Sequence, residues 1–221
     1  TIEELLRPNI LSLIPYSSAR NEFSGDAKIF LDANEHYRDF VGQQGRNRYP
    51  DPLQKKLKQV ISKVLDLPEE LLVVGNGSDE SIDLLFRLFC VPQKDRAIIM
   101  EPTYGAYAVF ASINDIGITN IPLTSDFSVD RNALDQFFNT QKEETLQTGM
   151  HKLLFICSPN NPTGNSIPLD DISYIAQQFQ GITVVDEAYF EFADTTSAVT
   201  LLATCDRLVV LRTLSKCWAL A

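Results

Sequence analysis

A lysine near the end of the sequence, Lys216, lies where an amine could do chemistry. It follows a short apolar run, residues 208–211, of the kind that forms a buried parallel strand. Sheets of the α/β class bind ligands at the carboxyl ends of their strands. Apolar neighbours disfavour a charge, so a lysine held among them becomes a usable nucleophile toward an aldehyde. The alternative is an ordinary surface lysine, because most lysines are exposed.

Two stretches rich in turn residues follow other apolar runs. The first is Gly75–Glu80 (GNGSDE), which opens a helical pattern, and the free N–H groups of a helix start bind anions such as phosphate. We expect the backbone of Ser78 and Asp79 to do this, with the acidic side chains turned away; a tight turn capped by Ser78 is the alternative. The second is Ser158–Gly164 (SPNNPTG), whose density of turn residues beside a presented amide favours a functional turn.

A carboxylate, Asp186, comes directly after the apolar run 182–185. At this position it is costly to bury unless a cation or a hydrogen-bond donor meets it. A protonated pyridine nitrogen would meet that need, and simple capping of the strand end is the alternative. Both Asp186 and Lys216 therefore belong to the same predicted edge of a sheet.

Alternating apolar runs and helical patterns predict the sheet that would hold these residues. Strand-like runs occur at 71–74, 97–100, 119–122, 152–157, 182–185 and 208–211, and helical patterns at 80–89, 107–113, 130–138 and 169–179. Apolar runs without alternation predict an α/β fold, a mostly parallel sheet with helices on both faces. The polar stretch 139–149 predicts a surface loop.

The first part of the chain has a different character. Residues 1–30 predict an arm with short helical segments at 2–6 and 10–13, followed by a brief strand at 29–31 and a loop at 37–48. Asp51 can then N-cap a helix with Pro52 at its first position and Gln54 at its third, the elements of a capping box. Apolar residues recur at helical spacing from there to Leu65.

Composition argues against several functions. The net charge of −10 is opposite to what binding a nucleic-acid backbone requires. No apolar run reaches membrane-spanning length, and the first residues lack the apolar core of a signal peptide. His36 and His151 stand alone, so no metal site is expected. The cysteines, at 90, 157, 205 and 217, are scattered without a C-x-x-C pair, which indicates a reduced, cytoplasmic protein.

Short motifs along nearly all of the chain resemble those of the fold type I pyridoxal-phosphate aminotransferases. In order they are GNGSDE, EPTY, SPNNPTG, VVDEAY and TLSK. Within that superfamily, LIPYSSAR, LDANE, RYPDP and VLRTLSK resemble the histidinol-phosphate aminotransferase branch.

The resemblance implies a role for each motif in holding pyridoxal 5'-phosphate. Lys216 would bind the cofactor covalently and then move a proton, and Asp186 would pair with the pyridine nitrogen. Asn161 and Tyr189 would hydrogen-bond the ring's phenolic oxygen, and Tyr104 would stack on the ring face. The cofactor phosphate would be held by the backbone N–H groups of Ser78 and Asp79 and by the hydroxyls of Thr213 and Ser215.

The resemblance also implies a homodimer. The family tyrosine that matches Tyr49 reaches the phosphate of the other subunit's cofactor, and Tyr16 and Asn34 match positions that line the substrate pocket. In the family, the segment after the lysine continues through a glycine to an arginine, and a small domain follows. We therefore expect an N-terminal arm (1–30) and a pyridoxal-phosphate-binding large domain (31–221) that is incomplete at its C-terminal end.

The expected reaction is transamination between histidinol phosphate and 2-oxoglutarate, giving imidazole acetol phosphate and glutamate. An aromatic amino-acid aminotransferase or a phospho-amino-acid decarboxylase of similar sequence is an alternative. A non-catalytic binding module on the same fold is a more remote one, since Lys216, Asp186 and Asn161 are all present. The variants Cys217-Trp218 and the sequence after Glu35 depart from the usual family pattern.

Overall fold

The computed structural model describes residues 1–17, 22–23, 25, 27–42, 45–141 and 149–220. The chain forms two compact units, one of Thr1–Ser12 with Gly75–Ala221 and the other of Leu13–Val74. The expected arm of residues 1–30 has residues in both units, and its role as an arm stays a prediction. Among the described helices, none is both long and apolar enough to cross a bilayer.

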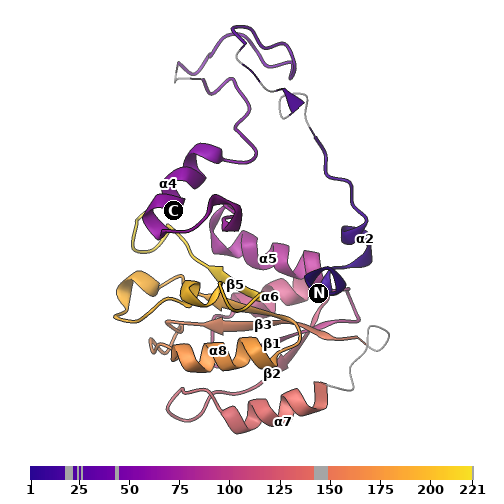
Figure 1. Cartoon of the computed structure of the whole chain (residues 1–221), viewed down its shortest axis with the longest axis vertical. Coiled ribbons are helices and arrows are strands. Elements are labelled where there is room, and N and C mark those ends of the chain that lie inside the picture. The colour runs from indigo at the N-terminus through magenta and orange to yellow at the C-terminus, as the bar shows by residue number, and fades with distance from the viewer. Residues whose placement is uncertain (18–21, 24, 26, 43–44, 142–148, 221) are drawn as a thin grey trace. The chain divides into compact units, whose positions relative to one another are not determined.

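The larger unit contains a parallel sheet of five strands in the order β2-β1-β3-β4-β5 (Figure 1). Each neighbouring pair runs parallel, and Cys157, Asp186 and Leu211 are aligned at the carboxyl ends of the last three strands. The strands are β1 (Arg96–Ile99), β2 (Gly117–Asn120), β3 (His151–Cys157), β4 (Ile182–Asp186) and β5 (Leu208–Leu211). The predicted parallel sheet is confirmed.

Helices cover both faces of this sheet, as predicted. Helices α5 (Gly77–Phe89) and α6 (Ala106–Ile113) pack on one face, and α7 (Arg131–Gln141) and α8 (Leu169–Gln178) pack on the other (Figure 1). Side chains alternate along each strand, so Leu153 and Phe155 of β3 join the first core while Leu154 and Ile156 join the second. The sheet is therefore packed between two apolar cores, which fix the positions of its strand ends.

Helix α5 shows why the sequence folds this way. Its buried residues are spaced one helical turn apart, at Ile82, Leu85, Phe86 and Phe89. They pack against the sheet and fix the direction of the helix. The N-terminus of α5 is thereby held at the edge where the strands end.

Two predicted strands are absent. Residues 71–74 do not form a strand: a 3-10 helix, η1 (Glu69–Leu71), precedes an extended segment, in which Val73 is 85% exposed. Residues 29–31 are not a strand either. An apolar run becomes a strand only if a neighbouring strand completes its hydrogen bonds, and neither run has such a partner among the described residues.

The strong helix after Asp51 is present as α4 (Lys55–Leu65), but it begins later than predicted. The Asp51 carboxylate accepts the N–H groups of Leu53 and of Lys55, the first helical residue, but Asp51 is not the N-cap that the sequence predicted. Gln54 has a left-handed backbone (φ 49°) and is the N-cap itself, which excludes Pro52 from the helix. The predicted capping box was therefore wrong.

The remaining elements are short. Helix α1 (Ile2–Leu5) matches the first predicted helical segment of the arm, whereas α2 (Pro8–Leu11) begins and ends two residues before the predicted 10–13. The 3-10 helices η2 (Phe190–Phe192) and η3 (Ala198–Leu201) lie between β4 and β5. The predicted loop at 139–149 begins inside α7, which ends at Gln141, and residues 142–148 lie outside the described residues.

Candidate active site

A cavity of about 190 Å³ lies at the carboxyl ends of the strands. Its walls come from the start of α5, the loop after β1, and the segments that follow β3, β4 and β5. The lining residues are Asn76, Gly77, Ser78, Asp79, Tyr104, Cys157, Asn161, Asp186, Ala188, Tyr189, Thr213, Ser215 and Lys216. All the cofactor residues expected from the larger unit thus meet in one cavity.

The start of α5 opens into this cavity. Gly77 has a φ of +76°, which favours glycine, and its Cβ position is open: apart from the adjacent residues and the backbone of α5 itself, no described heavy atom lies within 4 Å of it. The N-cap of α5 is Asn76, which makes no side-chain cap bond, and Ser78 lies inside the helix, so the alternative of a cap by Ser78 was wrong. The Glu80 carboxylate instead turns back to accept the Asn76 N–H. The first-turn N–H groups and the positive end of the helix dipole suit an anion here.

The Asp79 side chain was expected to turn away from the anion site, but it instead contacts a residue of the cavity wall. Its Oδ1 accepts a hydrogen bond from the Tyr104 hydroxyl at 3.3 Å. Burial, followed by the charge of Asp79, raises the pKa of Tyr104 above its ordinary value. Tyr104 therefore stays a neutral phenol whose ring forms one wall of the cavity.

Asp186 ends β4 and is only 2% exposed. Its Oδ2 accepts the Tyr107 hydroxyl at 2.8 Å and its Oδ1 accepts the Ala188 N–H at 3.0 Å. Burial raises the pKa of the Asp186 carboxyl, and these two hydrogen bonds counteract part of that increase. A cation arriving in the cavity would meet a carboxylate that is already oriented.

Tyr107 is a site residue that sequence reasoning missed. It occupies the first turn of α6 and is fully buried, and position 107 was predicted only as part of a helix. A buried tyrosine needs a partner for its hydroxyl, and that need was the available signal. The partner, Asp186, is 79 residues away in the sequence, so spacing alone could not reveal it.

The two asparagines of the turn after β3 have different roles. Asn160 is buried and donates hydrogen bonds to the Pro102 carbonyl at 2.9 Å and the Thr163 hydroxyl at 2.7 Å. These bonds fix the turn against the loop after β1. Asn161, the residue chosen from the sequence, lines the cavity.

Lys216 lies in the segment after β5, with Nζ 5.4 Å from the centroid of the Tyr189 ring. The expected burial among apolar neighbours was wrong, because Leu214, Trp218 and Leu220 are exposed together with Lys216. The end of the strand, rather than an apolar pocket, places this amine. Nearby, the Thr213 hydroxyl donates to the Ser215 hydroxyl at 2.9 Å and accepts the Ser215 N–H at 3.2 Å.

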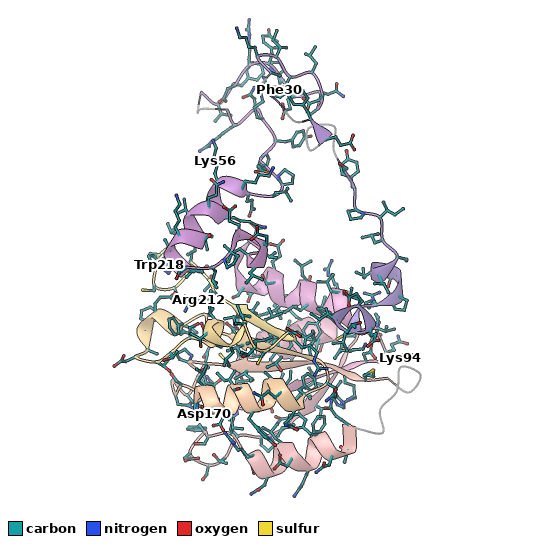
Figure 2. All side chains as sticks on the ribbon, viewed as in Figure 1. Phe30, Lys56, Lys94, Asp170, Arg212 and Trp218 are labelled. Carbon is teal, nitrogen blue, oxygen red and sulfur yellow. The ribbon has the colours of Figure 1, made fainter. Side chains whose placement is uncertain are left out.

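An ion pair ties the ends of β4 and β5 together. Nε of Arg212, which is labelled in Figure 2, lies 3.1 Å from Oε2 of Glu187, whose side chain is 3% exposed. Glu187 also accepts the Ser197 hydroxyl and the Ala198 N–H, each at 2.7 Å. Because Glu187 follows Asp186 and Arg212 precedes Thr213, this pair fixes two walls of the cavity relative to each other.

The other predicted site residues belong to the unit of residues 13–74. Asn34 and Tyr49 line a hollow within that unit, and Tyr16 is 90% exposed. The Glu35 carboxylate accepts the Tyr49 N–H at 2.7 Å and pairs with Arg48 at 2.8 Å. Tyr49 is thus anchored through its backbone, while the residue as a whole is 71% exposed.

A family model for aminotransferase class I and II matches residues 19–221. The chain belongs to the class I and II aminotransferase family. Histidinol-phosphate aminotransferases of Cytophaga hutchinsonii and Bacteroides thetaiotaomicron are 47% and 42% identical to the whole of this chain. The chain spans 61% and 60% of the lengths of these two relatives.

Solved structures establish the fold of this family member. A histidinol-phosphate aminotransferase of Sinorhizobium meliloti in complex with pyridoxal-5'-phosphate matches with a TM-score of 0.66 and 22% identity, over 78% of this chain and 46% of that chain. Cystalysin of Treponema denticola, which contains pyridoxal 5'-phosphate, matches with a TM-score of 0.64 and 18% identity, over 76% and 45%. The parallel sheet with helices on both faces is that of the fold type I enzymes.

Proposed function

We propose that the whole protein is a pyridoxal-phosphate-dependent transaminase that acts on histidinol phosphate with 2-oxoglutarate. The observation that carries this proposal is the cavity in which a buried carboxylate, an amine and an open helix N-terminus converge, at Asp186, Lys216 and Gly77–Asp79. The name shared by the similar relatives supports the choice of substrate.

The residues of the cavity fit this cofactor. The Asp186 carboxylate is buried with two protein donors, and a pyridinium nitrogen would supply the positive charge that such a group favours. The first turn of α5 and the hydroxyls of Thr213 and Ser215 would hold the phosphate. The Tyr104 ring would cover one face of the pyridine, and Asn161 with Tyr189 would hydrogen-bond its phenolic oxygen.

The chemistry supplied by bound pyridoxal phosphate is an aldehyde that takes up the substrate amine and a ring that accepts electrons. Lys216 Nζ would hold the cofactor covalently and, once released, carry the proton between the substrate Cα and the cofactor C4′. Asp186 would keep the ring nitrogen protonated through direct charge pairing. The tie between Glu187 and Arg212 would keep the segments of Asp186 and Lys216 in register during this transfer.

The assembly and location are part of the same proposal. The working unit would be a cytoplasmic homodimer in which Tyr49 reaches the cofactor phosphate of the partner subunit and Tyr16 and Asn34 contact the substrate. Three free cysteines are buried, which supports a reducing compartment. Residues 31–221 would form the cofactor-binding large domain, preceded by the arm.

A comparison of lysine variants tests the proposal. In the whole protein, Lys216→Ala should lower transamination of histidinol phosphate by at least about a hundredfold, because it removes the proton carrier. Borohydride reduction of the loaded wild-type protein followed by peptide mapping should place the pyridoxyl adduct on Lys216. Lys94→Ala, an exposed lysine outside the cavity, should leave both results unchanged.

Two outcomes would contradict this proposal. An adduct on Lys152 or another lysine would overturn the assignment of the site. A clear preference for phenylalanine over histidinol phosphate would instead leave the proposed transaminase activity standing but contradict the proposed substrate.

A further inference from the structure

Tyr107 forms a buried pair with Asp186, which lines the cavity. The Tyr107 side chain is 0% exposed, and its hydroxyl lies 2.8 Å from Asp186 Oδ2. The Tyr107 ring stacks on Phe155 with centroids 4.7 Å apart and meets the edge of Tyr104 at 5.5 Å. Contacts with Phe155 of the sheet and Tyr104 of the cavity wall therefore fix the orientation of the Tyr107 ring.

The hydrogen bonds of Asp186 come from fixed elements. Tyr107 belongs to α6, which packs on the sheet, and the Ala188 N–H belongs to the backbone just after β4. Without the phenol, Oδ2 would lose the only hydrogen bond that the described residues give it. Leaving a buried charged acceptor without a partner costs more than an ordinary hydrogen bond contributes.

We propose that Tyr107 is a positioning residue that holds the Asp186 carboxylate ionised and aimed at the ring nitrogen of pyridoxal phosphate. This inference rests on the proposed function, because Asp186 must pair with that nitrogen. Tyr107 acts through Asp186 and needs no contact with the cofactor. Burial and the neighbouring Asp186 charge raise the pKa of Tyr107 well above its ordinary value, so the phenol remains a donor at neutral pH.

Other titratable groups face Asp186 as well. Asp79 from α5 and the neighbouring Glu187 raise the pKa of Asp186, adding to the effect of burial, while the Tyr107 and Ala188 hydrogen bonds lower it. Cys157 of β3 faces the same carboxylate, and burial raises the pKa of its thiol to about 11. Tyr104 and Tyr189 also line the cavity. Among these groups, Tyr107 is the side chain whose hydrogen bond favours the charged form of Asp186.

The test is the affinity of the cofactor-free whole protein for pyridoxal phosphate as pH is varied. Tyr107→Phe should weaken binding about tenfold, the value of one hydrogen bond to a charged group. It should also move the loss of affinity to higher pH. Without the phenol the pKa of Asp186 rises further, so the carboxylate takes up a proton sooner as pH falls.

Tyr174→Phe is the matched control. The Tyr174 hydroxyl of α8 also donates to a carboxylate, that of Asp135, on the opposite face of the sheet. Removing it should leave the affinity and its pH profile unchanged. If Tyr107 had only a structural role, Tyr107→Phe would lower the melting temperature without changing how the affinity for pyridoxal phosphate depends on pH.

A second substitution covers the case in which Tyr107→Phe does not fold. Fluorotyrosine introduced at position 107 keeps the ring and the hydroxyl, but its phenol is more acidic and therefore a stronger donor. The loss of affinity should then move to lower pH, opposite to the effect of Tyr107→Phe. A pH profile that stays the same in either variant would overturn the role of Tyr107, whereas pyridoxal phosphate failing to bind the wild-type protein would overturn the proposed function instead.

Discussion

The Asp186 carboxylate sets the electrostatics of its immediate neighbours. Cys157 is aligned with it across β3 and β4, and its Sγ donates to the Pro159 carbonyl at 3.4 Å. Burial, followed by the Asp186 charge, raises the pKa of the Cys157 thiol to about 11. This cavity cysteine is therefore a neutral thiol at neutral pH, and the thiolate is the reactive form.

Thiol labelling should distinguish the cysteines. We expect an alkylating reagent to modify the exposed Cys217 of the native, cofactor-free protein and to leave Cys157 unmodified at neutral pH, as measured by mass spectrometry of peptides. In denaturant all the cysteines should react, which controls for detection. Rapid labelling of Cys157 in the native protein would show that its thiol is more exposed or more acidic than the structure indicates.

At the level of residues, the sequence located the cavity through turn and strand-end positions. Asp186, Lys216 and the turn of residues 158–164 were recognised because each follows an apolar run, and the ends of parallel strands meet at one edge. The choice of Asn161 within that turn came from the family resemblance. Tyr107 was missed because its position in α6 looks like that of any core residue. Its contact with Asp186 depends on how α6 packs on the sheet, which no local pattern contains.

Among the elements, β4 and β5 are joined at their ends by more than their ladder. The Glu187 N–H donates to the Leu211 carbonyl at 2.9 Å, and the Glu187 carboxylate pairs with Arg212. The Arg212 guanidinium also lies over the Phe190 ring, 4.1 Å from its centroid. Among the described residues, the other partners of this buried carboxylate are a hydroxyl and a backbone N–H, so Arg212 is the cation that offsets its charge.

Removing that cation should destabilise the protein measurably. Arg212→Met should lower the free energy of unfolding by about 2 kcal/mol, because it leaves the Glu187 carboxylate buried without its charged partner. Urea unfolding monitored by circular dichroism would measure this change. Arg207→Met is the control. Its guanidinium donates to Gln180 at the surface, so we expect a change of less than about 0.5 kcal/mol. Equal effects of the two substitutions would show that the ion pair contributes nothing specific.

Element boundaries were harder to predict than element types. The strands of the sheet were found because they are apolar on both faces, and the helices because of their spacing. Residues 71–74 have the same apolar composition, but no described segment pairs with them as a strand, and η1 includes the first of them, Leu71. Helix α4 begins at Lys55 because a turn that starts at Asp51 places Gln54 in the left-handed region.

The larger unit is assembled from distant parts of the chain. Thr1–Ser12 packs with Gly75–Ala221, although residues 13–74 lie between them in the sequence. The Arg7 N–H donates to the Leu88 carbonyl at 2.9 Å, and the buried Lys152 ammonium donates to the Leu5 carbonyl at 3.1 Å. Burial lowers the pKa of Lys152, so this contact is part of the structure rather than a surface charge. Nothing in the local sequence predicted that the first helix would dock here.

The unit of residues 13–74 has exposed apolar side chains of the kind found at protein interfaces. On α4, Leu57, Val60 and Val64 are all exposed. Exposed apolar residues on one helix are typical of a surface that meets a partner. Together with the family match of Tyr49, they are the basis for the proposed homodimer, in which each cavity would be completed by the partner subunit.

Mixing two inactive variants of the whole protein tests this assembly. In a mixed dimer of Tyr49→Phe and Lys216→Ala, one site would combine an intact Lys216 with the Tyr49 of the other subunit. We expect about a quarter of the wild-type activity after random mixing, because half of the dimers are mixed and each has one complete site. Lys216→Ala mixed with Asp186→Asn is the control, since both residues line the same chain's cavity and no site would be restored. If mixed dimers form but recover no activity, Tyr49 does not act across the interface.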